Sequence, residues 1–255
     1  MKIGILQGVL KNTENFPYKG WKSDLQDIEN KKFDFCDWII CEDPISTAHN
    51  PIFDFSGLRN TFKESKLDIP IRSIYCKCFD EYNLLDSDSV VILQKRVNII
   101  ESILLAARKQ NISKVIIPLN SKYNSLEDTQ IGNAVFILKM AVRSFYGSTI
   151  NLCLEPSIDS NKILEMFYKL DDKKLNYTKL SLRATDVMNM RYESLFIMKK
   201  YLANITLDEH VNMDRLLNYL SDIEYKGDFL IANSCFLEND LNLLKEWIAK
   251  EKKYV

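Results

Sequence analysis

Glu155 is the residue whose position in the sequence most directly suggests chemistry. It follows the apolar run 150–154 and precedes Pro156. The run is typical of a fully buried strand, and the proline, which has no N–H, is expected to end the ladder of that strand. A carboxylate at the exit of a buried strand costs free energy unless it meets a cation or several hydrogen-bond donors. We therefore predict a functional role for Glu155 and expect other strands to supply its partners.

The elements that must position Glu155 are short apolar runs that alternate with longer segments of helical period. The predicted strands are residues 2–7, 38–41, 71–76, 114–118, 151–154, 179–182, 203–207 and 229–232. The predicted helices lie within residues 20–33, 90–111, 132–147, 160–172, 192–203, 213–224 and 238–253. This alternation indicates βα units and a parallel sheet.

Eight βα units in 255 residues match the count and size of a (β/α)8 TIM barrel. We therefore predict an α/β fold with a single TIM-barrel domain over residues 1–255. A doubly wound sheet is the main alternative, and its nucleotide-binding members carry a glycine-rich turn after the first strand. Here the turn LQGVLKNTENFP contains one glycine, and neither G-x-G-x-x-G nor G-x-x-x-x-G-K-[ST] occurs in the chain.

Polar residues end nearly every predicted strand. In a TIM barrel the active-site residues lie at the carboxyl ends of the strands, so these polar residues are the candidates for substrate binding. They are Gln7, Glu42, Lys77, Asn120, Asp186 and Asn233, and Arg183, also at a strand end, is a candidate catalytic residue together with Glu155. Each of them has an alternative interpretation as a solvated loop residue or a helix cap, and Asp186 in particular is a candidate cap for a helix that begins near Met190.

Composition excludes several classes of function. The formal net charge is −1, which gives no basic surface for nucleic acid, and no apolar run approaches the ~20 residues of a membrane span. The start MKIGILQGVL lacks a cleavage site and predicts a first strand, so we expect a cytoplasmic protein. The two histidines, His49 and His210, are too few for a three-histidine metal site, and the spacing of Cys76 and Cys78 is unusual for zinc.

Several stretches together resemble the sugar phosphate isomerase/epimerase family, which has a xylose isomerase-like TIM barrel. The opening MKIGILQGVL with FPYKGW resembles the first strand, Gln-Gly turn and first helix of that family. The stretch KKFDFCDWIICED resembles its second strand, and IPIRSIYCKCF and QNISKVIIPL are similar to its third and fourth. INLCLEPSI resembles the fifth strand, which carries a functional glutamate, and MDRLLNYLSDIEYKGDFLIAN resembles the last helix and the eighth strand.

The resemblance implies a divalent-metal site that this chain has lost in large part. Metal-dependent members hold the cation with glutamate, aspartate, histidine and glutamate on strands five to eight. The matching positions here are Glu155, Arg183, Thr206 and Asn233, so one ligand of four remains. We therefore expect no metal cofactor, although a divalent ion such as Mn²⁺ stays the alternative, and we expect the guanidinium of Arg183 to pair with Glu155.

Two hypotheses about function remain open at this stage. In the first, the protein is an isomerase or epimerase that acts on a sugar or sugar phosphate, with Glu155 as base and Arg183 stabilising an enediolate, assisted by Lys77. In the second, it is a non-catalytic barrel that binds a carbohydrate or a partner protein. A phosphodiester-cleaving relative is a weaker third, because it would need a richer metal cluster and a basic surface. A homodimer is compatible with the sequence.

Overall fold

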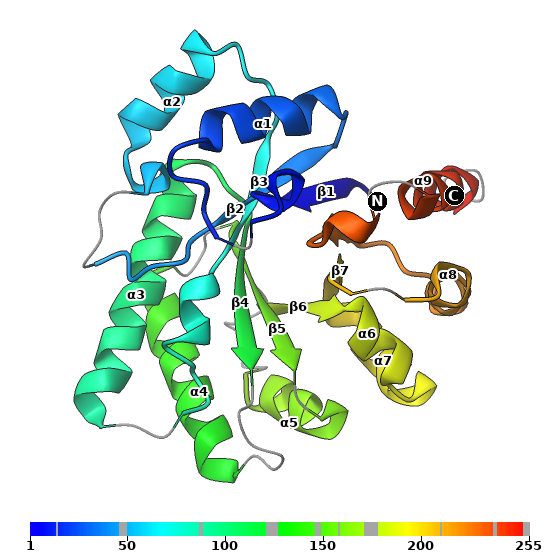
Figure 1. Cartoon of the computed structure of the whole chain (residues 1–255). Coiled ribbons are helices and arrows are strands. Elements are labelled where there is room, and N and C mark those ends of the chain that lie inside the picture. The colour runs from blue at the N-terminus through cyan, green and yellow to red at the C-terminus, as the bar shows by residue number, and fades with distance from the viewer. Residues whose placement is uncertain are drawn as a thin grey trace.

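Eight parallel strands close into a barrel, which confirms the predicted (β/α)8 TIM fold (Figure 1). The computed structural model describes residues 1–13, 15–45, 50–86, 89–120, 127–145, 149–157, 159–170, 178–209, 211–236 and 239–251. His49 and His210 lie outside these residues. Each strand pairs with the next along the chain, and β8 pairs with β1. The strands are β1 Ile3–Leu6, β2 Phe35–Ile39, β3 Ile71–Tyr75, β4 Lys114–Asn120, β5 Asn151–Ser157, β6 Thr178–Arg183, β7 Leu202–Leu207 and β8 Asp228–Ile231.

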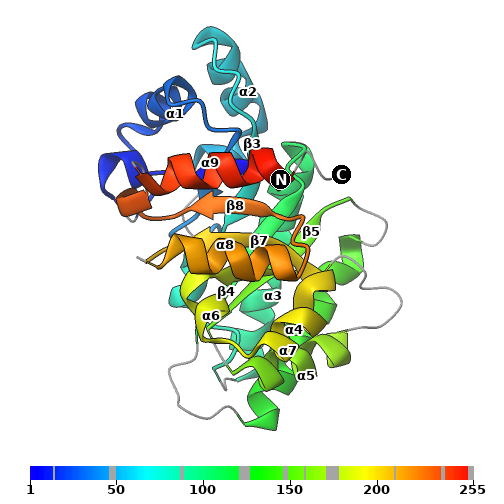
Figure 2. The same ribbon diagram turned by 90° about the vertical axis from the view of Figure 1, so that its right-hand side faces the viewer.

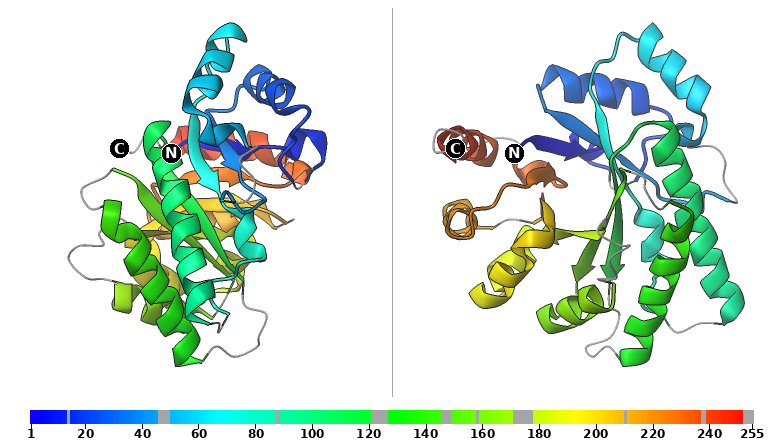
Figure 3. Two further views of the ribbon diagram at one scale, coloured as in Figure 1. Left: turned by 90° about the vertical axis from the view of Figure 1, so that its left-hand side faces the viewer. Right: turned by 180° about the vertical axis from the view of Figure 1, so that it is seen from behind.

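Helices form an outer ring around the strands, as Figures 1 and 3 show. They are α1 Trp21–Asn30, α2 Phe55–Glu64, α3 Val90–Lys109, α4 Asp128–Val142, α5 Ser160–Leu170, α6 Ala184–Asn189, α7 Tyr192–Met198, α8 Met213–Asp222 and α9 Asn239–Glu251. Helices α3 and α4 lie side by side, and so do α8 and α9 (Figure 2). None of the helices among the described residues combines the length and the apolar character that a membrane crossing requires.

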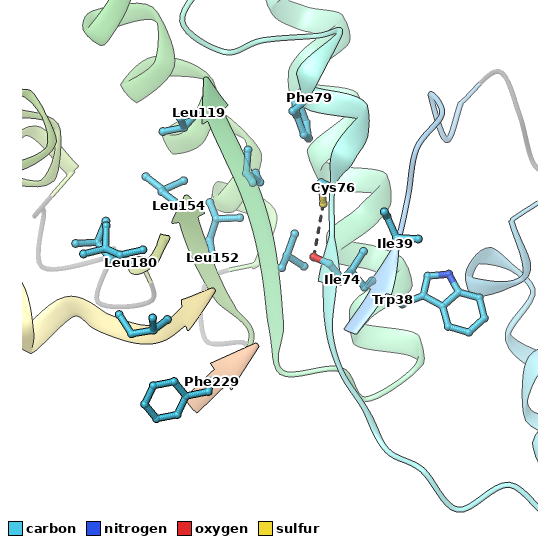
Figure 4. Packing of buried hydrophobic residues seen from close by; sticks show 14 of the residues in the cluster. Trp38, Ile39, Ile74, Cys76, Phe79, Leu119, Leu152, Leu154, Leu180 and Phe229 are labelled. Atoms are coloured by element: carbon cyan, nitrogen blue, oxygen red, sulfur yellow. Dashed lines mark hydrogen bonds between the residues drawn. The ribbon is translucent and has the colours of Figure 1, made fainter. Parts of the chain in front are cut away.

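The barrel has two separate apolar regions. The larger lies between the strands and the helices and contains outward-facing strand residues such as Trp38, Leu152 and Phe229 (Figure 4). The smaller fills the inside of the barrel and includes Phe35, Ile116, Cys153 and Leu230. Because side chains alternate along a strand, the two regions fix which residues of each strand face inward.

Charged residues occupy the barrel interior at the amino ends of the strands. Asp228 begins β8, and its Oδ2 lies 2.9 Å from Lys114 Nζ and 3.1 Å from Arg72 Nη2. Asp37 of β2 is also buried there, and burial raises its pKa to about 6, although a hydrogen bond from Ser73 opposes the shift. This end of the barrel is therefore closed by ion pairs, and the site lies at the other end.

The bounds of two strands differ most from the sequence-based expectation. Strand β2 begins at Phe35 and ends at Ile39, three residues ahead of the predicted start and two ahead of the predicted end. Strand β5 continues through Pro156, which pairs with Leu119 of β4, so the prediction that this proline ends the ladder is wrong. The pairing between β5 and β6 stops at Leu154, and a proline is tolerated where one side of a strand is unpaired.

Candidate functional site

Glu155 lies inside the barrel near the carboxyl end of β5, and only 1% of it is exposed. Its Oε1 accepts a hydrogen bond of 2.8 Å from the hydroxyl of Tyr75 on β3. Its Oε2 accepts hydrogen bonds of 3.1 Å from Ser181 on β6 and 2.8 Å from Thr206 on β7. Ser181 in turn accepts a hydrogen bond of 2.6 Å from the amide of Asn204. Hydroxyl groups from three strands therefore satisfy the buried carboxylate.

Arg183, the last residue of β6, contributes the positive charge of the site. Its Nε lies 3.4 Å from Glu155 Oε1 and 3.8 Å from Asp208 Oδ2, and its Nη2 donates a 3.4 Å hydrogen bond to Asn120 Oδ1. Burial lowers the pKa of Arg183, but Glu155, Tyr75 and Asp208 more than offset this, so its pKa lies above the ordinary value. The predicted contact between Glu155 and Arg183 is thus present. It is made through Nε and does not have the two parallel bonds of a bidentate pair.

Tyr75 is held in its protonated form. Burial raises the pKa of its hydroxyl well above the ordinary value, and the negative charge of Glu155 raises it further. The phenol therefore stays a donor to the carboxylate at physiological pH.

A pocket of about 470 Å³ opens at the carboxyl ends of the strands, directly over Glu155 and Arg183. Leu6, Val9 and Ile39 give it an apolar side. Its charged lining residues among those described are Lys77, Asp80, Glu155, Arg183, Asp208 and Glu209. The volume is that of a small polar ligand site, with an apolar wall and convergent charged groups.

Two further carboxyl groups of the pocket, those of Asp208 and Asp80, differ in how far protein groups satisfy them. Asp208 follows β7, and its buried Oδ1 has no hydrogen-bond partner among the described residues. Burial raises the pKa of Asp208, although Arg183 opposes the shift. Asp80 accepts a 2.7 Å hydrogen bond from Asn120, and burial raises its pKa against the opposing charge of Lys77. Of the two, Asp208 retains an unused acceptor beside the guanidinium of Arg183.

The loop between β1 and α1 forms one wall of the pocket through Val9, Asn12 and Thr13. Gly8 makes the turn possible because its φ is 90°, a conformation that residues with a Cβ rarely adopt. The N–H of Gly8 donates a 2.8 Å hydrogen bond to Oδ2 of Asp24, a fully buried residue of α1. The first helix therefore anchors this wall.

Three of the residues predicted to bind substrate lie at the site. Lys77 and Asn233 line the pocket, and Asn120 bridges Asp80 and Arg183. Asp186 lies in the first turn of α6 and lines a neighbouring cavity of about 330 Å³ between α5 and α7. Burial raises the pKa of Asp186 to about 6, with Arg183 opposing the shift. Its alternative role as a cap near Met190 is wrong, since α6 has already begun at Ala184.

Gln7 and Glu42 do not line the pocket, which corrects their assignment as substrate-binding residues. Leu6 faces the inside of the barrel, so the next residue, Gln7, faces the opposite side, where it is 1% exposed. Glu42 is exposed because β2 ends at Ile39 and the loop has already left the barrel mouth.

Sequence reasoning overlooked Tyr75 and Ser181 as partners of Glu155. Both lie within predicted strands, one or two residues ahead of the polar strand ends that were considered. The signal that could have found them is alternation: residues two positions apart on a strand share a face, and Ser181 is two positions before Arg183. Inward-facing hydroxyls just below the strand ends were therefore the partners to look for.

Two of the side chains at positions that the resemblance aligns with metal ligands donate hydrogen bonds to a third, the carboxylate of Glu155. Both oxygens of Glu155 already accept hydrogen bonds, and the guanidinium of Arg183 lies beside them. Thr206 uses its hydroxyl as a donor to the same carboxylate. In the part of the chain that the structure describes, no group of three or more His, Cys, Asp or Glu residues is arranged to hold a metal ion. That the protein works without a metal stays a prediction.

Comparison with solved structures identifies the fold. A D-tagatose 3-epimerase-like protein superposes with a TM-score of 0.72 at 17% identity, covering 100% of this chain and 99% of the other. The D-allulose 3-epimerase of Methylomonas sp. in complex with D-allulose gives 0.70 at 14% identity, covering 94% and 88%. This chain has a xylose isomerase-like fold. A xylose isomerase domain protein from Planctomyces limnophilus, with a TM-score of 0.68, 13% identity and coverage of 99% and 98%, agrees. No protein-family model and no curated protein sequence matches the chain.

Proposed function

We propose that this xylose isomerase-like barrel binds a small sugar in the mouth pocket and catalyses isomerisation or epimerisation next to the sugar carbonyl. The observation that carries the proposal is the Glu155–Arg183 ion pair at the floor of a pocket of about 470 Å³. The fold shared with a D-tagatose 3-epimerase-like protein and a D-allulose 3-epimerase supports the carbohydrate class.

Arg183 is the group that would stabilise the reaction's developing negative charge. Removal of a proton from the carbon next to a carbonyl sends the electron pair to the carbonyl oxygen, which becomes an enediolate oxygen. A guanidinium has five N–H groups, and the contacts of Arg183 with described residues use Nε and one group on Nη2. N–H groups therefore remain for a ligand oxygen. Glu155 would fix the orientation of the guanidinium and keep it charged.

Asp208 is a better candidate for the proton acceptor than Glu155. The oxygens of Glu155 accept hydrogen bonds from Tyr75, Ser181, Thr206 and Arg183, which occupy about all of the lone-pair positions of a carboxylate. Asp208 has an oxygen without a partner among the described residues, and burial raises its pKa, which makes its carboxylate a stronger base. Return of the proton from Asp208 to the adjacent carbon would complete an isomerisation. In an epimerisation, Asp208 would pass its proton to water, and water would deliver a proton to the opposite face of the same carbon.

Deuterium exchange tests this proposal directly. The protein is incubated in D2O with EDTA and with D-tagatose, D-fructose or D-allulose, and deuterium at the carbon next to the carbonyl is measured by NMR. We expect exchange that persists in EDTA, falls at least 100-fold in Asp208→Asn and Arg183→Met, and is unchanged in Arg215→Met, an exposed control on α8. Exchange that disappears with EDTA and returns with added Mn²⁺ would contradict the metal-free mechanism.

A non-catalytic sugar-binding barrel is the second candidate. The full hydrogen bonding of Glu155 favours it, as does Asn233, an amide in the pocket at a position where the resemblance to metal-dependent epimerases implies a second acid. Binding of a sugar without deuterium exchange, under conditions in which Arg183→Met abolishes the binding, would support this alternative over the enzyme.

A further inference from the structure

We infer that the mouth pocket selects uncharged sugars and rejects sugar phosphates. This inference rests on the proposed sugar-binding function and narrows its substrate class. It derives from the number, sign and partners of the charged side chains around the pocket.

The pocket carries more negative than positive charge. Its acidic lining residues are Asp80, Glu155, Asp208 and Glu209, against the basic residues Lys77 and Arg183. A phosphate monoester carries a charge of about −1.5 to −2 near pH 7, so it would enter a field of its own sign. Partly enclosed pockets screen such repulsion less than open surface does.

The two cations of the pocket are already engaged by acids of the protein. Arg183 contacts Glu155 and Asp208, and its Nη2 donates to Asn120. Lys77 is close enough to Asp80 to oppose the rise of that carboxyl's pKa. A phosphate would have to compete with these carboxylates for both cations, whereas a hydroxyl or carbonyl oxygen needs only one N–H donor.

The loops that most often bind phosphate in TIM barrels carry carboxylates here. Phosphate sites in this fold lie at the loops after strands seven and eight. The loop after β7 presents Asp208 and Glu209 to the pocket, and the loop after β8 presents Asn233 and Ser234. The N–H of Cys235, which could otherwise face an anion, donates to Asn233 Oδ1 at 3.0 Å. Among the residues of these two loops that the structure describes, no Lys or Arg side chain lines the pocket.

An uncharged sugar matches the same groups. Its hydroxyls can donate to the carboxylates of Asp208 and Glu209 and accept from Arg183, and hydrogen bonds with one ionised partner are the stronger kind. The apolar wall of Leu6, Val9 and Ile39 can cover the C–H face of the sugar.

Matched pairs of ligands test the selectivity. Binding of D-fructose and D-tagatose is compared with binding of their 6-phosphates by calorimetry at pH 8, low salt and with EDTA, with inorganic phosphate as a separate probe. We expect the free sugar to bind at least tenfold more tightly than its phosphate, which corresponds to about 1.4 kcal/mol, and inorganic phosphate not to compete.

Variants assign the selectivity to the pocket. Glu209→Gln should lower the ratio of the affinity for the free sugar to that for its phosphate about threefold, and Glu209→Lys should lower this ratio further or reverse the preference. Glu193→Gln, which changes an exposed acid on α7, should leave the ratio unchanged. Equal or tighter binding of the phosphates, or a preference that Glu209→Lys does not alter, would overturn this inference and leave the proposed sugar function standing. If neither free nor phosphorylated sugars bind or exchange, the proposed function itself fails.

Discussion

Removal of Arg183 should destabilise the protein mainly by leaving the buried charge of Glu155 unpaired. Nε of Arg183 lies 3.4 Å from Oε1 of a carboxylate that is 1% exposed. At an effective dielectric constant of about 20, that separation corresponds to roughly 5 kcal/mol of gross attraction. The guanidinium side chain is 28% exposed and returns to water in part, and Tyr75, Ser181 and Thr206 still support the carboxylate. We therefore expect Arg183→Met to lower the free energy of unfolding by about 2–3 kcal/mol.

The double variant separates the ion pair from other effects of the two substitutions. Glu155→Gln alone leaves Arg183 with Asp208 and Asn120, and we expect a cost of about 1–2 kcal/mol. Glu155→Gln with Arg183→Met removes both charges, so its cost should be smaller than the sum of the single costs by about 1.5–2 kcal/mol.

Urea unfolding at pH 7, followed by circular dichroism, measures all four proteins. Arg215→Met serves as the control for loss of an exposed guanidinium and should change stability by less than about 0.5 kcal/mol. Single costs that add to the double cost within about 0.5 kcal/mol would refute the reasoning, because they would show that Glu155 is held by its hydroxyl partners alone.

Three further predictions concern the groups around this pair. Asp37→Asn should remove a pH dependence of stability, because burial raises the folded-state pKa of Asp37 from 3.8 to about 6 and folding therefore favours the protonated form. In the unmodified protein, roughly 3 kcal/mol of stability that is present below pH 4 is lost as the pH rises through 6. Urea unfolding at a series of pH values measures this slope, and a variant that keeps it would contradict the assignment to Asp37. Tyr75→Phe removes the hydroxyl that donates a 2.8 Å hydrogen bond to Glu155, and it should lower the free energy of unfolding, measured by thermal unfolding, by about 1.5–3 kcal/mol. The loss should be clearly smaller in a Glu155→Gln background, and an equal loss in both backgrounds would show that the phenol acts through packing. Gly8→Ala should cost about 1–3 kcal/mol, because φ is 90° and a Cβ would lie 2.8 Å from the carbonyl oxygen of Thr13, and a neutral effect in urea unfolding would contradict that strain.

The sequence was sufficient for the barrel because each strand leaves a local signal. Parallel strands covered by helices are buried on both faces and appear as short apolar runs, so all eight could be located. The start of β2 was placed too late because Asp37 interrupts the apolar run FCDWI. That aspartate is buried among charged partners inside the barrel, and nothing in the local sequence reveals them.

Helix α2 was missed for a different reason. Of its ten residues only Leu58 is buried, and Gly57 interrupts the segment, so the helical period is weak. The helix begins at Phe55 because the side chain of Asp54 accepts a hydrogen bond from the N–H of Gly57.

The candidate site was predictable as a location and only in part as a set of contacts. Glu155 and Arg183 could be paired from the sequence because neighbouring strand ends meet at the barrel mouth. Tyr75 lies 80 residues from Glu155 in the sequence, and its contact depends on the register across β3, β4 and β5. A shift of one residue would have turned the phenol to the outer face, and the local sequence does not determine that choice.

The donors around Glu155 also explain how its buried carboxylate can be stable without a cation. A cation site surrounds one positive charge with acceptor atoms. Here the charges are the other way round, because one negative charge is surrounded by hydrogen-bond donors. Two of these donors, Arg183 and Thr206, lie at positions where the resemblance to metal-dependent epimerases implies metal ligands. Tyr75 and Ser181 complete the set from neighbouring strands. Because a buried carboxylate is costly only when it is unpaired, these donors stabilise Glu155. The positive group that would face a ligand is then the guanidinium of Arg183, which still has N–H groups available.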